Sequence, residues 1–158
     1  MSVSFWFKLN FTTVNSGTKI ISKSGYGSSY GWDFQLELWG SGQGALQFRI
    51  PSSGTAVDYS NYYCPDEGCD AWNTDHWYHV VGVFIPSVAV DLYVDGARMT
   101  RIDNTITATM FTNNVNLDIG RRPIGADYFN GLIDEVRIYE SVLLEEEVES
   151  LSFLTLSL

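Results

Sequence analysis

Two cysteines enclose a short segment of turn-forming residues. Cys64 and Cys69 flank the sequence Pro-Asp-Glu-Gly at positions 65–68, and residues of these types favour tight turns. Cysteines on either side of a turn can lie close enough for a disulfide, which persists in oxidising compartments. His76 and His79 follow shortly afterwards, and with the two thiols they would make four zinc ligands. We predict a Cys64–Cys69 disulfide, with a zinc site as the alternative.

Aromatic residues crowd the stretch from residue 51 to residue 75, which is rich in Gly, Ser and Asp. Exposed rings stack on the apolar faces of sugars, and nearby carboxylates and amides orient the sugar hydroxyls. Loops on a rigid scaffold are a common place for such recognition. The stretch therefore predicts a glycan-binding loop, unless its rings only pack the loop onto the rest of the protein. The candidate ligand-binding residues are Tyr59, Tyr62, Tyr63 and Trp72.

Carboxylates in an arrangement suited to catalysis are hard to find. Hydrolysis of a glycosidic bond with retention requires two carboxyl groups about 5 Å apart. Glu37 is the only glutamate of its segment, and the neighbours Asp134 and Glu135 would face opposite sides of one strand. The glutamates at 145–147 are explained by a solvated helix face. We predict that the protein is not an enzyme.

Strands must position these side chains, because apolar and polar residues alternate along most of the chain. A period of two is typical of antiparallel strands with one buried face and one outward face. Asp95-Gly96 follows one alternating segment and suits a tight hairpin turn. Short strands separated by Gly- and Asn-rich turns indicate a β-sandwich. The expected strands are residues 3–9, 33–38, 46–50, 79–84, 90–94, 117–120 and 131–139.

A single helix is expected near the C-terminus. Residues 143–151 are acidic at their start, as the helix dipole favours, and Ser141 is the expected N-cap. The predicted architecture is all-β: a two-sheet antiparallel sandwich with one short C-terminal helix, formed by a single domain over residues 1–158.

Composition limits the function further. The chain has 158 residues, of which 45% are hydrophobic and 18% charged, so one domain with a packed core is expected. Its net charge of −10 would repel a phosphate backbone, which argues against nucleic-acid binding. No apolar run approaches the roughly 20 residues that a membrane span needs. The expected disulfide and the glycosylation sequon at Asn10 favour an extracellular or cell-surface location.

Several segments occur in an order that resembles a known family. The chain carries Trp-Tyr-His-Val-Val-Gly-Val-Phe at 77–84, Leu-Tyr-Val-Asp-Gly at 92–96, Ile-Gly at 119–120 and Tyr-Phe-Asn-Gly-Leu-Ile-Asp-Glu-Val-Arg-Ile-Tyr at 128–139. This succession resembles the laminin G-like domains of the concanavalin A-like lectin/glucanase superfamily, across residues 3–151. The resemblance implies an extracellular, non-catalytic jelly roll that binds glycans or glycoproteins. It also implies calcium as a cofactor.

Calcium would involve Asp134, whose position is associated with structural calcium in some members of that family. Asp134 shares strand parity with Leu132, so it would point inward if the Leu132 face is the core. A buried carboxylate needs an ion or several hydrogen-bond donors, and Asp127 and Asn130 are nearby oxygen ligands. The alternative is that Asp134 sits at the end of its strand and accepts backbone N–H groups from a neighbouring loop.

The resemblance implies one further strand ahead of Val3, which this sequence lacks. A sandwich without that strand would have an unpaired sheet edge. Residues 152–158 are apolar and alternating, and we predict that they form a strand that fills this edge in their own domain or in a neighbouring subunit. The alternative function is therefore a structural subunit of an extracellular filament joined by strand exchange. A glycan-active enzyme is the third alternative.

Overall fold

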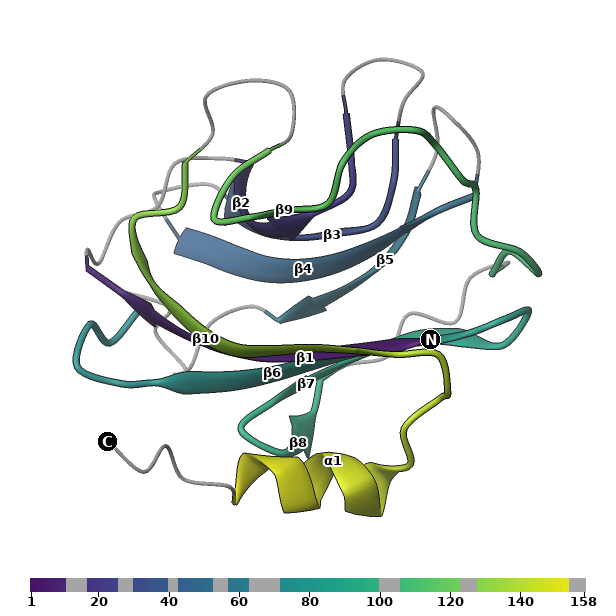
Figure 1. Ribbon diagram of the computed structural model, residues 1–158. Coiled ribbons are helices and arrows are strands. Elements are labelled where there is room, and N and C mark those ends of the chain that lie inside the picture. The colour runs from purple at the N-terminus through teal and green to yellow at the C-terminus, as the bar shows by residue number, and fades with distance from the viewer. Residues whose placement is uncertain are drawn as a thin grey trace.

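The computed structural model describes residues 1–10, 17–25, 30–39, 43–52, 57–62, 72–99, 106–122 and 128–153. Within these ranges two antiparallel β-sheets lie face to face, with a helix outside the layers (Figure 1). Sheet A has the order β10 (Gly131–Tyr139), β1 (Ser2–Leu9), β6 (Tyr78–Ile85), β7 (Ala89–Val94) and β8 (Ala97–Arg98). Sheet B has the order β5 (Val57–Tyr62), β4 (Gln43–Pro51), β3 (Asp33–Trp39), β2 (Thr18–Ser22) and β9 (Asp118–Ile119). The predicted sandwich is confirmed.

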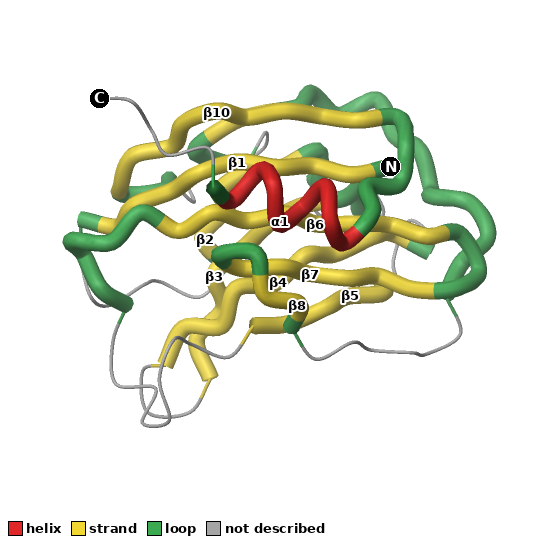
Figure 2. The backbone as a smooth tube through the Cα atoms, turned by 90° about the horizontal axis from the view of Figure 1, so that it is seen from below, coloured by secondary structure: helices red, strands yellow, loops and turns green. Residues whose placement is uncertain are grey.

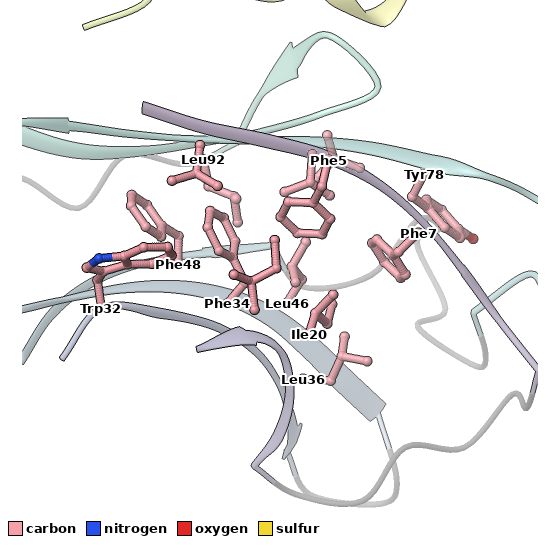
Figure 3. Packing of buried hydrophobic residues seen from close by; sticks show 14 of the residues in the cluster. Phe5, Phe7, Ile20, Trp32, Phe34, Leu36, Leu46, Phe48, Tyr78 and Leu92 are labelled. Carbon is pink, nitrogen blue, oxygen red and sulfur yellow. The ribbon is translucent and has the colours of Figure 1, made fainter. Parts of the chain in front are cut away.

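Apolar side chains from both sheets meet between the layers (Figure 3). The ring centroids of Phe5 in sheet A and Phe34 in sheet B lie 4.9 Å apart, and Phe34 stacks on Phe48 at 4.5 Å. At Gly82 the layers are so close that a Cβ would lie 2.5 Å from the Phe34 ring. The core residues expected from the alternation are 3% exposed or less: Val3, Phe5, Phe7, Leu9, Phe34, Leu36, Leu46, Phe48 and Ile50.

The helix α1 (Glu145–Ser152) lies over the outer face of sheet A (Figure 2). Its one fully buried residue, Val148, belongs to a small apolar cluster with Val81 and Val83 of β6. Leu144 is the N-cap, and the Glu147 carboxylate accepts the Leu144 N–H at 2.8 Å. The prediction of Ser141 as the cap is wrong, because the N-cap lies three residues later and the helix begins at Glu145. The described residues contain no helix that is long and apolar enough to cross a membrane.

The tight turn predicted at Asp95-Gly96 joins β7 to β8. Both residues have positive φ, 51° at Asp95 and 81° at Gly96, as a two-residue hairpin requires. The Asp95 carboxylate also accepts the backbone N–H of His79 at 2.8 Å, and its second oxygen lies 2.8 Å from His76 Nε2. One side chain thus fixes the turn against the start of β6.

A bulge in β10 reverses the predicted orientation of the side chains that precede it. The pairing of β10 with β1 shifts register between Ser4 and Trp6, and Glu135 has a positive φ of 51°. Because a bulge adds one residue to one strand, Ile133 and Val136 both pack against the core, whereas Leu132 is 51% exposed. The expectation that the Leu132 face forms the core is therefore wrong for Leu132, although Val136, expected on the same face, does contact the core.

Two segments differ from the sequence prediction. Residues 57–62, expected as part of a long loop, form β5 and pair with residues 46–51 of β4. Ser152, expected to begin a strand, ends α1. Residues 154–158 lie outside the described ranges, so a strand there stays a prediction. In sheet A the outermost described strand is β10, since β1 has partners on both sides.

Candidate functional site

The outer face of sheet B carries a connected set of polar side chains. Along β3, Asp33, Gln35 and Glu37 alternate with the core residues Phe34 and Leu36, so the three polar residues point away from the core. Asp33 is nevertheless 0% exposed and Gln35 only 4%. Buried polar groups are stable only when they have partners, and these partners lie on the adjacent strands.

An ion-pair cluster surrounds Asp33. Arg49, its cross-strand neighbour on β4, donates to both carboxylate oxygens, from Nε at 2.8 Å and from Nη2 at 2.7 Å. The ammonium of Lys19 on β2 lies 3.2 Å from Oδ2 of the same carboxylate. Lys19 is 1% exposed and the Arg49 side chain 18%. Asp33 therefore bridges β2 and β4 through charge-assisted hydrogen bonds.

Burial and charge act in opposite directions within this cluster. Burial alone would raise the pKa of Asp33, but Arg49 and Lys19 hold that pKa below its usual range. Burial lowers the pKa of Lys19 to about 8, against the attraction of Asp33 and with the help of the like charges on Arg49 and Arg122. Burial would also lower the pKa of Arg49, yet Asp33 raises it overall. Asp33 thus stays ionised, and Lys19 is the group closest to losing its charge.

Amide groups extend the cluster along the face. Lys19 donates to the Gln35 side-chain oxygen, and Gln35 Nε2 donates to Gln47 Oε1 at 2.6 Å and to Glu37 Oε2 at 3.1 Å. These contacts hold the amides and carboxylates in fixed orientations before any ligand arrives, which lowers the entropic cost of binding. We call this set the sheet-B network: Lys19, Asp33, Gln35, Glu37, Gln47 and Arg49.

A separate pocket of about 200 Å³ includes Trp32 in its lining but no member of the sheet-B network. Trp32 is 6% exposed and belongs to the core cluster, so its ring faces the opposite side of the chain from Asp33. The other walls of the pocket come mainly from the 110–113 segment, and its lining includes Lys23, Trp32, Met110, Phe111, Thr112 and Asn113. The segment is attached to sheet B because Phe111 N–H donates to the Pro51 carbonyl at 3.1 Å. Phe111 is 39% exposed, so part of its ring is open to solvent.

The structure corrects the predicted role of Trp72. Its side chain is 2% exposed, and its ring lies 5.6 Å from the Phe7 ring and 4.9 Å from the Tyr78 ring, in edge contacts. The Tyr78 hydroxyl accepts the Asn73 backbone N–H at 2.9 Å, which closes the segment over the core. Trp72 is therefore a core residue and not an exposed platform for a sugar.

The other predicted aromatic ligands fall partly outside the described residues. Tyr59 and Tyr62 lie in β5, for which only the backbone is described; Tyr59 pairs with Arg49 of the sheet-B network, whereas Tyr62 pairs with the core residue Leu46. Residues 63–71 lie outside the described ranges. The role of Tyr63 and the Cys64–Cys69 disulfide therefore stay predictions.

The calcium candidate Asp134 is exposed, and its Oδ1 accepts the backbone N–H of Glu135 at 2.7 Å. This contact is to the next residue of β10 and not to a neighbouring loop, and Asp134 lies within the strand and not at its end. The inward orientation is wrong, because the side chain is exposed. The residues that the structure describes contain no group of three or more His, Cys, Asp and Glu side chains placed to hold a metal. Calcium stays a prediction, as does glycosylation of the exposed Asn10, whose amide donates to Asn130 Oδ1 at 3.1 Å.

The two histidines have different surroundings. His76 is half exposed and contacts the Asp95 carboxylate. His79 is 3% exposed beneath the Trp6 ring, with ring centroids 4.9 Å apart, and burial lowers its pKa to about 4. Its Nδ1 has no hydrogen-bond partner within the described part of the chain. His79 is therefore neutral near pH 7.

The sequence had one signal for the sheet-B network. Asp33, Gln35 and Glu37 alternate with apolar residues, which correctly predicts that they face outward. Nothing in that alternation indicates that outward residues are buried or that Lys19 and Arg49 flank Asp33, because both facts depend on strand order.

Comparison with known proteins assigns this sandwich to a family. A laminin G domain model, described as the concanavalin A-like lectin/glucanases superfamily, matches residues 1–149. The chain belongs to this superfamily. A search of curated protein sequences found no match.

Solved structures with the same concanavalin A-like fold include binding domains of larger proteins. Domain 4 of AbnA, an extracellular arabinanase of family GH43 from Geobacillus stearothermophilus, was solved with arabinotriose and is 22% identical with a TM-score of 0.59. The receptor-binding domain of botulinum neurotoxin mosaic serotype C/D is 19% identical with a TM-score of 0.67, and the binding domain of botulinum neurotoxin DC in complex with SialylT is 14% identical with a TM-score of 0.61.

Each comparison covers 96% of this chain. The chain spans 65% of the arabinanase domain structure, 35% of the serotype C/D domain and 34% of the DC domain. At these identities the likeness establishes the fold.

Proposed function

We propose that this concanavalin A-like domain is a non-catalytic, extracellular glycan-binding module, with the sheet-B network as its site. The observation that carries the proposal is the network itself, in which ionic and amide groups are fixed on an outward sheet face. A few precisely placed polar groups are what orient a ligand in a binding site.

The chemistry of the network suits hydroxyl recognition. Carboxylate and amide oxygens accept hydrogen bonds, while amide and guanidinium N–H groups donate them, so both kinds of partner for a sugar hydroxyl occur within one row. Glu37 and Arg49 are the partly exposed members of that row, and they are the expected contacts. The arabinanase domain with arabinotriose supports the proposal, because it shares the fold and was solved with a sugar.

The state of Asp33 argues against a hydrolytic role for this face. A general acid must carry a proton near the working pH, whereas Arg49 and Lys19 hold the pKa of Asp33 below its usual range. Both of its oxygens already accept hydrogen bonds from Arg49. The carboxylate therefore positions other groups and does not transfer a proton.

Binding can be tested on an array of neutral and acidic oligosaccharides that includes arabino-oligosaccharides, followed by calorimetry on the best ligand. Glu37→Gln should weaken binding about tenfold, because a hydrogen bond to a charged group contributes about 1.5–3 kcal/mol. Glu135→Gln is the matched control, since Glu135 is an exposed glutamate on sheet A that pairs with Arg137. An empty array, or equal weakening by both variants, would contradict the proposal.

A second candidate function is self-assembly through strand exchange. The β10 edge exposes Leu132 by 51% and Ile138 by 48%, and in the described part of sheet A this edge has no further strand. Edges of this kind accept strands from other chains, and the apolar residues 154–158 of a second copy are the proposed donor. Removal of residues 154–158 should then convert oligomers to monomers in light scattering. Monomers both before and after removal would rule out this assembly.

A further inference from the structure

The pocket lined by Trp32 and the 110–113 segment lies at the rim of the hydrophobic core. Trp32 belongs to the core cluster and Met110 packs against it, whereas Phe111 is 39% exposed. The pocket therefore opens from the core to solvent, and the surface that its described walls expose is almost entirely apolar. Because this lining contains no member of the sheet-B network, a molecule bound here would be a second ligand of the domain.

The polar groups in the walls of this pocket already bond to one another. The Lys23 ammonium donates to the Val115 carbonyl at 2.8 Å and lies 3.5 Å from the Asn113 carbonyl. Asn113 Nδ2 donates to the Lys23 carbonyl at 3.1 Å and to the Tyr30 carbonyl at 3.0 Å. Asn113 Oδ1 accepts the Val115 N–H at 3.1 Å. The charged end of Lys23 is thus held against backbone carbonyls, and its aliphatic stem remains as wall.

Backbone contacts hold the walls of the pocket in place. The 110–113 segment is tied to sheet B by the hydrogen bond from Phe111 N–H to the Pro51 carbonyl, at 3.1 Å. On the opposite wall, a Cβ at Gly31 would lie only 1.8 Å from the Lys23 carbonyl oxygen, so these two backbones are in direct contact. The pocket is therefore formed before a ligand binds, which lowers the entropic cost of binding.

The size of the pocket limits what it can hold. Its volume is about 200 Å³, and an apolar cavity of about 150 Å³ binds benzene. One six-membered ring with a short substituent therefore fits. Thr109 and Asn114, which flank the lining segment, are exposed and polar, so the apolar surface does not continue along the segment as the core of a protein interface would require.

We propose that this pocket binds a small neutral hydrophobic molecule with a single ring, through contacts with Trp32, Met110 and Phe111. The inference is independent of the proposed glycan site, because the two sets of residues do not overlap. A neutral ring matches both the volume and the apolar walls. A sugar of the same size would bury hydroxyl groups without partners, and a charged ring would lose its hydration with little in return.

The test compares toluene with benzoate, which has the same ring but carries a charge. Toluene at about ten times its Kd should raise the Tm of the intact chain by roughly 3–6 °C, because a ligand that binds only the folded state stabilises it. Benzoate and glucose at the same concentration should leave Tm unchanged. Nuclear Overhauser effects between toluene protons and the Met110 methyl group should locate the ligand in the wild-type protein.

Two phenylalanine variants form a matched pair. Phe111→Ala should weaken toluene binding about fivefold in calorimetry, because part of the apolar surface that toluene buries is removed. Phe153→Ala removes a ring that is 79% exposed and lies at the end of α1, outside the pocket, so it should leave toluene binding unchanged. The Met110 contact tests the site even if Phe111→Ala does not fold.

The outcomes separate this inference from the glycan proposal. A Tm that does not respond to toluene, or an equal response to toluene and benzoate, would overturn the inference. Toluene that contacts other methyl groups and not Met110, or equal weakening by Phe111→Ala and Phe153→Ala, would place the ligand elsewhere and also overturn it. Glycan binding without toluene binding would leave the proposed function standing, and toluene binding with an empty glycan array would leave only this inference standing.

Discussion

The substitution Asp33→Asn tests whether the sheet-B network stabilises the fold as its geometry indicates. Asparagine keeps the shape of the side chain but removes the charge that pairs with Arg49 at 2.7 Å and with Lys19 at 3.2 Å. Removal of one partner from a buried ion pair costs about 3–5 kcal/mol, because the other charges stay buried without compensation. In a domain of this size each kcal/mol lowers Tm by about 2–4 °C. We therefore expect Tm to fall by roughly 6–20 °C at neutral pH.

The pH dependence of this loss provides a second measurement. Lys19 has a pKa of about 8, lowered by burial and raised by Asp33, so its pKa should fall further in the variant. Between that lower value and pH 8 the folded variant has lost a proton that its unfolded chain keeps, and its stability rises with pH there. The stability of the wild type does not rise for this reason until about pH 8. The difference between the two proteins in free energy of unfolding should therefore be larger at pH 6 than at pH 9.

Urea unfolding followed by circular dichroism at both pH values measures this difference. Asp134→Asn is the matched control, because Asp134 is exposed and an amide oxygen can still accept the Glu135 N–H. We expect the control to stay within about 0.5 kcal/mol of the wild type. A loss for Asp33→Asn below about 1 kcal/mol, or an equal loss at pH 6 and pH 9, would refute the reasoning.

Three further predictions concern other parts of the chain. Trp72→Ala should lower the free energy of unfolding by about 3–5 kcal/mol in urea titrations, because it leaves a cavity beside Phe7; a loss of binding without destabilisation would contradict the burial of this ring. The pKa of His79 is about 4 in the folded protein and 6.5 in the unfolded chain. The free energy of unfolding should therefore fall by roughly 3 kcal/mol as the pH drops from 6.5 to 4, and His79→Gln should remove this pH dependence. Thiol labelling of the unreduced, denatured protein should find neither Cys64 nor Cys69 reactive, and two reactive thiols would exclude the disulfide.

The fold was predictable because it depends mostly on local patterns. Alternation in residues 3–9 and 46–50 indicates strands with one buried face, and Asp95-Gly96 indicates its turn, since each signal lies within a few residues. The β5 segment escaped prediction because its sequence, Val-Asp-Tyr-Ser-Asn-Tyr, is largely polar. The bulge at Glu135 escaped it because a strict period of two cannot represent an added residue.

The site was less predictable, because its contacts join distant parts of the chain. Lys19, Asp33 and Arg49 belong to three strands, and only the order of those strands brings the charges together. Trp72 lies in a polar stretch, which indicated exposure, yet its partners Phe7 and Tyr78 come from β1 and β6. Composition around a residue does not reveal which distant surface covers it.

The position of β1 between β10 and β6 in sheet A has a consequence for synthesis of the chain. β1 pairs with β6 and with β10, and Ser2 Oγ accepts the backbone N–H of Leu143, 141 positions later. A nascent chain can therefore join β1 to β6 and β7 early, but one edge of β1 stays open until the ribosome has released β10. During that interval the growing protein exposes Phe5 and Phe7 near an open edge, a state prone to aggregation. Slow translation of the segment between β7 and β10 would lengthen this exposure, whereas fast delivery of β10 would shorten it.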